Sequence, residues 1–192
     1  MPQTVRRTDG ESITDRERRE VRILAAGDES LTVTWSRYAQ GERGPDLHIH
    51  REHTDAFYVL SGTVTYILGA EGERVERASA GTVVVVGADV PHAFRNDDEA
   101  DAVFLNAHAP DAGFAAYMRD LRDGAPASFD SYDLPVAGTR PAGEAALVAP
   151  GAGEPDADGG LVRYDGADLH VVERGDAIEL SVPGGAAIVF VR

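Results

Sequence analysis

The chain has 192 residues, with 33 acidic and 18 basic side chains, a formal net charge of −15 and no cysteine. The absence of cysteine excludes disulfides, thiolate metal ligands and a cysteine nucleophile, and the absence of lysine excludes a Schiff-base mechanism. The negative charge disfavours nucleic acid as a partner, because such binding requires a basic face that displaces counterions.

No segment of the sequence has the length and hydropathy of a membrane span or a signal peptide. The longest apolar run, 83–86, is far too short to cross a bilayer. No apolar stretch follows the two arginines near the N-terminus, as a signal peptide would require. We therefore expect a cytoplasmic protein with no membrane partner.

Residues 1–20 are expected to form an N-terminal arm, and the sequence from there to about residue 109 consists of short β-like runs separated by glycine or polar turns. The predicted strands are 31–38, 47–50, 56–60, 63–68, 74–78, 82–86, 93–95 and 102–107. Many short strands at this spacing favour an antiparallel sandwich or barrel over a sheet of alternating strands and helices.

One helix is predicted after these strands, between Asp111, a good N-cap, and Gly124, a good terminating residue. The apolar residues of this segment recur at the spacing of a single helical face. They are Phe114, Tyr117, Met118 and Leu121.

The C-terminal part begins with a segment rich in Pro, Gly and Ala, at 134–160, which is expected to form an extended loop. Strand character then returns at 161–164, 169–173, 178–182 and 187–191. We predict a barrel with its following helix at 21–125, and an extension at 126–192 whose strands pack on the same domain. A segment this short would make a poor independent core.

The segment 48–62 (HIHREHTDAFYVLSG) contains the residues most suited to chemistry. His48 and His50 are two apart, so on a strand both imidazoles face the same side. Asp55 begins the next run, and an adjacent antiparallel strand would bring its carboxylate within reach of both rings. His92 begins a later strand. Three imidazoles and one carboxylate suit Fe(II), Mn(II), Co(II), Ni(II), Cu(II) or Zn(II), and are too rich in nitrogen for calcium or magnesium.

The spacing of these residues resembles the two motifs of the cupin superfamily. In the first motif, His-x-His is followed by three or four residues, Glu, six residues and Gly; here His48-x-His50 is followed by four residues, Asp55, six residues and Gly62. In the second motif, Gly is followed by five residues, Pro-x-Gly, two residues, His, three residues and Asn. This chain has Gly81, five residues, Gly87-x-Asp89, two residues, His92, three residues and Asn96.

This resemblance implies an all-β fold, a cupin-type double-stranded β-helix (jelly-roll) barrel, with one short helix after the barrel and additional terminal strands. It implies one divalent transition metal held by His48, His50, Asp55 and His92. It also implies a homodimer.

The main departure from the cupin pattern is Asp55, which stands where the motif has glutamate. Its side chain is shorter by one carbon–carbon bond, about 1.5 Å. Three arrangements stay open: direct ligation by Asp55, ligation through a water, or replacement by another donor such as His53. An Asp55 or His53 that does not ligate the metal could act as a general base, so both are candidate catalytic residues.

The remaining candidate residues carry weaker signals. Phe57 shares the face of Asp55, and Phe94 shares the face of His92, so these two aromatics are predicted to wall a substrate pocket. His108, just before the helix, is interpreted as a packing or capping residue. His170, in a late strand, is interpreted as structural.

Three functions remain open for a small-molecule substrate. The first is a metal-dependent dioxygenase of flavonol- or enol-like substrates, because a single cupin barrel followed by HAPDAGFAAYMRDL resembles small quercetinase-like cupins. The second is an isomerase, lyase or decarboxylase that uses the ion as a Lewis acid. The third is a non-enzymatic cupin that binds a small ligand or a metal.

Overall fold

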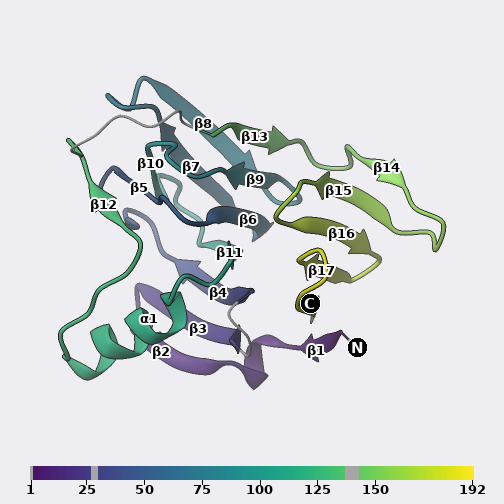
Figure 1. The fold of residues 1–192 in the computed structure, drawn as a ribbon, viewed down its shortest axis with the longest axis horizontal. Helices are drawn as coiled ribbons and strands as arrows, with labels where there is room; N and C mark the ends of the chain where they lie inside the picture. Colours follow the sequence, from purple (N-terminus) through teal and green to yellow (C-terminus); the bar gives the residue numbers. More distant parts are fainter. Residues whose placement is uncertain (1, 27–29, 137–142) are drawn as a thin grey trace.

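The strands form three sheets that stack as layers (Figure 1). The computed structural model describes residues 2–26, 30–136 and 143–192. Within these residues the strands form separate sheets rather than one hydrogen-bonded closed barrel. No described helix is long and apolar enough to span a membrane.

The middle layer is a seven-stranded sheet of order β13-β9-β6-β11-β4-β3-β2. Its strands are β2 (Glu11–Asp15), β3 (Arg19–Ala26), β4 (Thr32–Tyr38), β6 (Thr54–Ser61), β9 (Val83–Val86), β11 (Ala102–Ala109) and β13 (Ala145–Val148). On one side lies a five-stranded sheet of order β12-β5-β10-β7-β8. It consists of β5 (His48–Ile49), β7 (Thr63–Leu68), β8 (Arg74–Ser79), β10 (His92–Arg95) and β12 (Tyr132–Asp133).

A six-stranded sheet of order β1-β18-β17-β16-β15-β14 covers the other side of the middle layer. Its strands are β1 (Gln3–Val5), β14 (Glu154–Pro155), β15 (Leu161–Asp165), β16 (His170–Arg174), β17 (Ala177–Ser181) and β18 (Ala187–Val191). β1 pairs in parallel with β18, so the two ends of the chain lie near each other (Figure 1).

The alternation of side chains along a strand explains why the middle sheet can be buried on both faces. On β6, Ala56 and Tyr58 pack toward the six-stranded sheet, whereas Phe57 and Val59 pack toward the five-stranded sheet. β9 is four consecutive valines, and they alternate between the two apolar clusters in the same way. A run without polar residues is the expected sequence for a strand covered on both sides.

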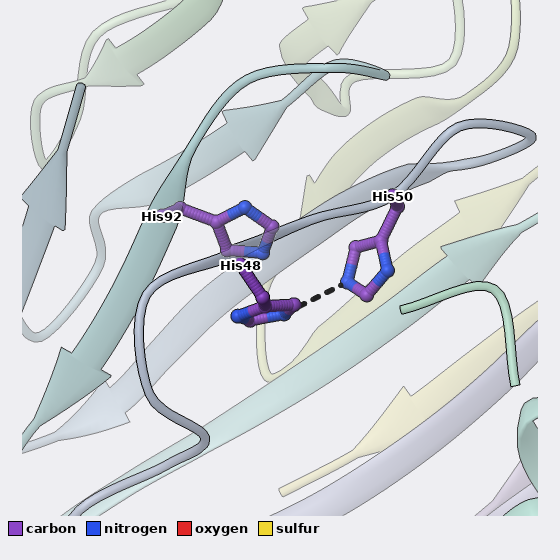
Figure 2. Close-up of side chains that lie close together, drawn as sticks. All are labelled: His48, His50 and His92. Carbon is purple, nitrogen blue, oxygen red and sulfur yellow. Dashed lines mark hydrogen bonds between the residues drawn. The ribbon is translucent and has the colours of Figure 1, made fainter. Parts of the chain in front are cut away.

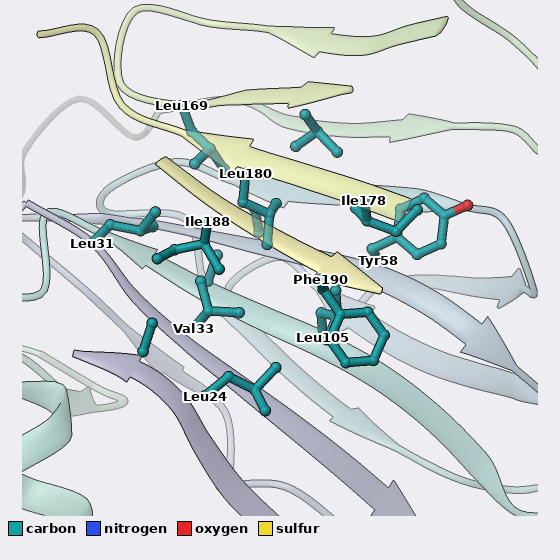
Figure 3. Close-up of a cluster of buried hydrophobic side chains, with 14 of the residues drawn as sticks. Leu24, Leu31, Val33, Tyr58, Leu105, Leu169, Ile178, Leu180, Ile188 and Phe190 are labelled. Atoms are coloured by element: carbon teal, nitrogen blue, oxygen red, sulfur yellow. The ribbon is translucent and has the colours of Figure 1, made fainter. Parts of the chain in front are cut away.

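The contact between the middle and six-stranded sheets is formed by large apolar side chains (Figure 3). Ile178, Leu180 and Phe190 of the six-stranded sheet pack against Val33 and Leu105 of the middle sheet. Burying each such side chain contributes about 1.5–3 kcal/mol to stability. The C-terminal strands therefore form part of one hydrophobic core with the rest of the chain.

Segments predicted as an arm and a loop also contain strands. Residues 1–20 include β1, β2 and a short 3-10 helix, η1 (Arg7–Asp9), and β2 pairs with β3. In the Pro-, Gly- and Ala-rich segment, β13 pairs with β9. Residues 137–142 of that segment lie outside the described residues.

The predicted helix is present as α1 (Phe114–Asp123), with Gly124 in the left-handed conformation at its C-terminus. Its N-cap is Gly113 and not the predicted Asp111, although the carboxylate of Asp111 accepts a hydrogen bond from the backbone nitrogen of Ala115 (3.3 Å). Arg119 and Arg122 both pair with Glu11 at 2.7 Å, which fixes the helix against β2. The segment that follows α1 then returns to the five-stranded sheet and ends in β12, beside β5.

Candidate metal centre

His48, His50 and His92 lie together at one end of the space between the five-stranded and middle sheets (Figure 2). β5 and β10 pair with His92 directly opposite His48, so these two side chains stand side by side on one face. His50 follows two residues after His48. The Nε2 atoms of His48 and His50 are 3.1 Å apart, and the ring centroids of His48 and His92 are 4.3 Å apart.

The hydrogen bonds of these rings determine which nitrogen carries the proton. Nδ1 of His48 lies 2.8 Å from the backbone oxygen of Asp46, and Nδ1 of His92 lies 2.9 Å from that of Val90. Nδ1 of His50 bonds the backbone oxygen of Asp130. A carbonyl oxygen only accepts, so each Nδ1 donates a proton and each Nε2 keeps a lone pair. Metal-binding histidines commonly donate their second nitrogen in this way.

The arrangement of these lone pairs suits a metal ion and is unfavourable without one. The two Nε2 atoms at 3.1 Å are both acceptors, so no hydrogen bond holds them together. Two nitrogen ligands with bonds of about 2.1 Å lie about 3.0 Å apart when they occupy adjacent positions around an ion. Burial, followed by the neighbouring His92 and His50, lowers the pKa of His48 to about 3. The ring is therefore neutral at neutral pH, as a ligand must be.

Asp55 lies beside the three histidines. Its Oδ2 atom is 3.3 Å from Nε2 of His92 and 3.5 Å from Nε2 of His50. These separations suit neighbouring donors beside His50 and His92, but no Asp55 atom belongs to the group of donor atoms formed by His48, His50 and His92, and Asp55 is grouped instead with His53 and His108. The carboxylate and the three rings are each at most 4% exposed. A buried carboxylate among lone pairs requires a cation or a proton.

A second group of donor atoms lies on the other side of Asp55. Nδ1 of His108 is 3.0 Å from Oδ1 of Asp55 and 3.1 Å from Nε2 of His53, and His53 Nε2 is 3.6 Å from Asp55 Oδ1. β11 and β6 pair with His108 directly opposite Asp55. Burial lowers the pKa of His108 well below its usual value. The sequence interpretation of His108 as a packing residue overlooked this position.

Asp130 orients the turn that carries His53. Its Oδ2 atom accepts hydrogen bonds from Nδ1 of His53 (2.9 Å) and from the backbone nitrogens of Arg51 (3.0 Å) and Glu52 (2.7 Å). With three donors already bound, this oxygen serves to position His53. No sequence pattern pointed to Asp130, because it lies 77 residues from His53 in a segment without a motif. Its place follows from the pairing of β12 with β5.

The site is covered by the segment between α1 and β12. The ring of Phe129 lies 5.0 Å from that of His53 and 5.4 Å from that of His50. Phe114, at the start of α1, stacks on His108 at 3.7 Å. This aromatic cover limits the access of water to the polar groups below it, which strengthens their electrostatic interactions.

The predicted pocket aromatics lie deeper between the same two sheets. Phe57 and Phe94 have ring centroids 5.2 Å apart and pack with Tyr66 and Phe104. The hydroxyl of Tyr66 is buried and has no hydrogen-bond partner among the described residues. His170 lies elsewhere, partly exposed and 3.0 Å from Asp165. The predicted ligands are thus together, with the two phenylalanines in the adjoining apolar cluster.

Comparison with known proteins agrees with this architecture. Residues 34–108, which include all the histidines and the aspartate of the two groups, match the Cupin domain family. This match supports the cupin superfamily, and the mostly β structure of the described residues, with one short helix, confirms the predicted all-β class. No curated protein matches the chain.

Several solved structures are similar to this chain at low sequence identity. KdgF from Halomonas sp. is 17% identical, with a TM-score of 0.45, over 54% of this chain and 90% of that chain. The polyketide cyclase RemF from Streptomyces resistomycificus is 23% identical, with a TM-score of 0.48, over 57% and 80%. An RmlC-like cupin from Methanocaldococcus jannaschii is 19% identical, with a TM-score of 0.43, over 50% and 84%.

Proposed function

We propose that this protein is a metal-dependent enzyme, a dioxygenase of small flavonol- or enol-like substrates, with one divalent transition metal on His48, His50, His92 and Asp55. The observation that carries the proposal is the convergence of three Nε2 lone pairs, each fixed by an Nδ1 hydrogen bond to a backbone oxygen. This donor set suits Fe, Mn, Ni, Co, Cu or Zn. Such an ion supplies Lewis acidity and, where it is redox-active, reactivity toward dioxygen.

The residues of the chain supply orientation, a dry environment and a place for a proton. Asp130 fixes the ring of His53, so that His53 Nε2 faces Asp55 rather than solvent. An enol must lose its hydroxyl proton to become a good chelating ligand. With one bound ion, His53 Nε2 and Asp55 Oδ1 are basic atoms outside the three-histidine group, so they are the proposed proton acceptors in that case.

The substrate is proposed to lie near Phe57 and Phe94, because these rings belong to the apolar cluster between the same two sheets as the histidines. A flat, aromatic or enolic molecule would pack against them while its oxygen atoms reach the metal side. Phe129 packs against His50 and His53 and shields this part of the site.

A second candidate function is an oxygen-independent isomerase, lyase or decarboxylase. The observation that favours it is the His53–Asp130 pair, an imidazole oriented by a carboxylate. Such a pair is suited to repeated proton transfer at carbon. In this reaction His53 would take the proton from the substrate, and oxygen would not be consumed.

Oxygen uptake separates the two candidates. Protein reconstituted with each of the six metals is supplied with a panel of flavonols and other chelating enols, in air and under strict anaerobiosis. A dioxygenase consumes one dioxygen per substrate and stops without oxygen. Equal turnover under anaerobiosis would exclude the dioxygenase, and His48→Ala controls for reactions of free metal.

A further inference from the structure

We propose that the chain holds a second divalent transition metal, on His53 Nε2, His108 Nδ1 and Asp55 Oδ1, with Asp55 between the two groups of donor atoms. The three atoms lie 3.0, 3.1 and 3.6 Å from one another. All three side chains are buried. The inference rests on the metal centre proposed above, because the two sites share Asp55.

The hydrogen bonds around this group leave each of its atoms with a lone pair. Nδ1 of His53 donates to Oδ2 of Asp130 (2.9 Å), so its Nε2 is an acceptor. Nε2 of His108 lies 2.8 Å from Oδ1 of Asn106, whose amide nitrogen donates to the backbone oxygen of Ala56 (3.5 Å). Asn106 therefore presents its oxygen to His108, and Nδ1 of His108 is also an acceptor. Asp55 Oδ1 is buried and has no hydrogen-bond partner in the described part of the chain.

Three buried acceptors that face one another need a positive charge between them. Their separations resemble those of adjacent ligands around an ion with bonds of about 2.1 Å, which lie about 3.0 Å apart at right angles. Two imidazoles and a carboxylate are also the ligand chemistry of a transition metal rather than of calcium or magnesium.

One ion cannot serve both groups in this arrangement. Ligands of a single ion lie within about 4.2 Å of one another, which is twice the bond length. Among the described residues, no group of donor atoms within 4.8 Å of one another combines His48 with His53 or His108. A third group, of His50, His53 and Asp130, differs because Asp130 Oδ2 already accepts three hydrogen bonds.

Asp55 is placed to join the two sites. Oδ2 faces His92 and His50, while Oδ1 faces His108 and His53. Strand register produces this arrangement, because β6 sets Asp55 opposite His108 on β11. In enzymes with two metal ions, both ions can hold one substrate. A metal here would occupy both His53 Nε2 and Asp55 Oδ1, so these atoms would then be ligands and not the proton acceptors proposed for the protein with one ion.

Metal stoichiometry tests the proposal. The full chain is stripped with a chelator and titrated with Zn(II) or Co(II), and bound metal is measured after equilibrium dialysis. We expect two equivalents for the unaltered protein, and one each for His108→Ala and His53→Ala. His170→Ala, a histidine outside both groups, should still bind two. Circular dichroism verifies that each variant is folded, and having two variants of the second site keeps the test valid should one fail to fold.

The outcomes separate this proposal from the first centre. One equivalent in the unaltered protein, unchanged in His108→Ala and lost in His48→Ala, would overturn the second site and leave the first in place. No bound metal at all would overturn both. Two equivalents that persist in His108→Ala and in His53→Ala would place the second ion elsewhere and would also contradict the proposal.

Discussion

The two faces of the seven-stranded sheet perform different tasks with alternate residues of the same strands. On β11, Leu105 and Ala107 pack toward the six-stranded sheet, in the apolar cluster shown in Figure 3. Asn106 and His108 point the other way, toward the donor groups. The comparison shows that period-two alternation lets one strand contribute to stability and to a polar site without conflict.

The face of the seven-stranded sheet that carries the donor groups changes from apolar to polar along the strands. Toward one end, Phe57 and Phe104 form an aromatic cluster with Phe94. At the other end, the same strands carry Asp55 and His108. The apolar end excludes water from the polar end, so neutral imidazoles and a charged carboxylate interact there in a low-dielectric environment.

The largest expected effect comes from a substitution in the apolar cluster between the seven-stranded and six-stranded sheets. Phe190→Ala should lower the free energy of unfolding by about 3–5 kcal/mol, because it removes a buried ring and leaves a cavity. Urea unfolding followed by circular dichroism measures this change, with Val75→Ala, 56% exposed, as the control expected to change little. Metal stoichiometry of the folded protein should be unchanged. A lower stoichiometry in folded Phe190→Ala would show that the two faces are coupled.

The next largest effect is expected from substitution of a proposed metal ligand. His92→Ala should weaken metal binding by at least about 100-fold, since loss of partners that merely orient ligands already costs 10–100-fold. Competition with a chromophoric chelator measures the affinity. The control is His170→Ala, which should bind as the unaltered protein does. Equal affinities for the two variants would remove His92 from the site.

Substitutions of Asp55 should have a smaller, graded effect. If Oδ2 ligates the ion, Asp55→Asn should weaken metal binding by about 10–100-fold, and Asp55→Glu should retain affinity because the carboxylate is kept. The same chelator competition measures both variants. Unchanged affinity in Asp55→Asn, together with lost turnover, would instead identify Asp55 as a base beside the metal.

The smallest effect is expected at Glu20, at a distance from the site on β3. Burial raises the pKa of Glu20, but hydrogen bonds from Arg22 and Arg7 outweigh burial and place the pKa below its usual value of 4.5. A lowered pKa stabilises the fold above pH 4.5, and this contribution is lost as the pH falls through the folded-state pKa. Glu20→Gln should therefore cost about 1 kcal/mol at pH 7 and little in strong acid. Urea unfolding at both pH values measures the difference, and an equal loss at both would contradict the charge-based explanation.

The proximity of His48, His50 and His92 could be expected from the sequence, because it depends on local spacing. His48 and His50 share a strand face, and the spacing to Asp55 and His92 matches a known pair of motifs. The alternation of Phe57 with Asp55 also follows from period two. These inferences need only the strand period and the order of the motifs.

The second group depends on information that short-range patterns do not contain. His108 meets Asp55 only through the register of β11 against β6, across 53 residues of sequence. Asp130 lies in a segment that contains no motif, and it reaches His53 because β12 pairs with β5. The N-terminal strands were missed for a similar reason, since β1 gains its partner from β18 at the other end of the chain.

Anomalous diffraction from crystals of metal-loaded protein, at the absorption edge of the bound metal, is the most direct test of the centre. The account predicts a peak bonded to the Nε2 atoms of His48, His50 and His92, with Asp55 Oδ2 as a further ligand. No peak between these three nitrogens, in crystals soaked with each candidate metal, would contradict it.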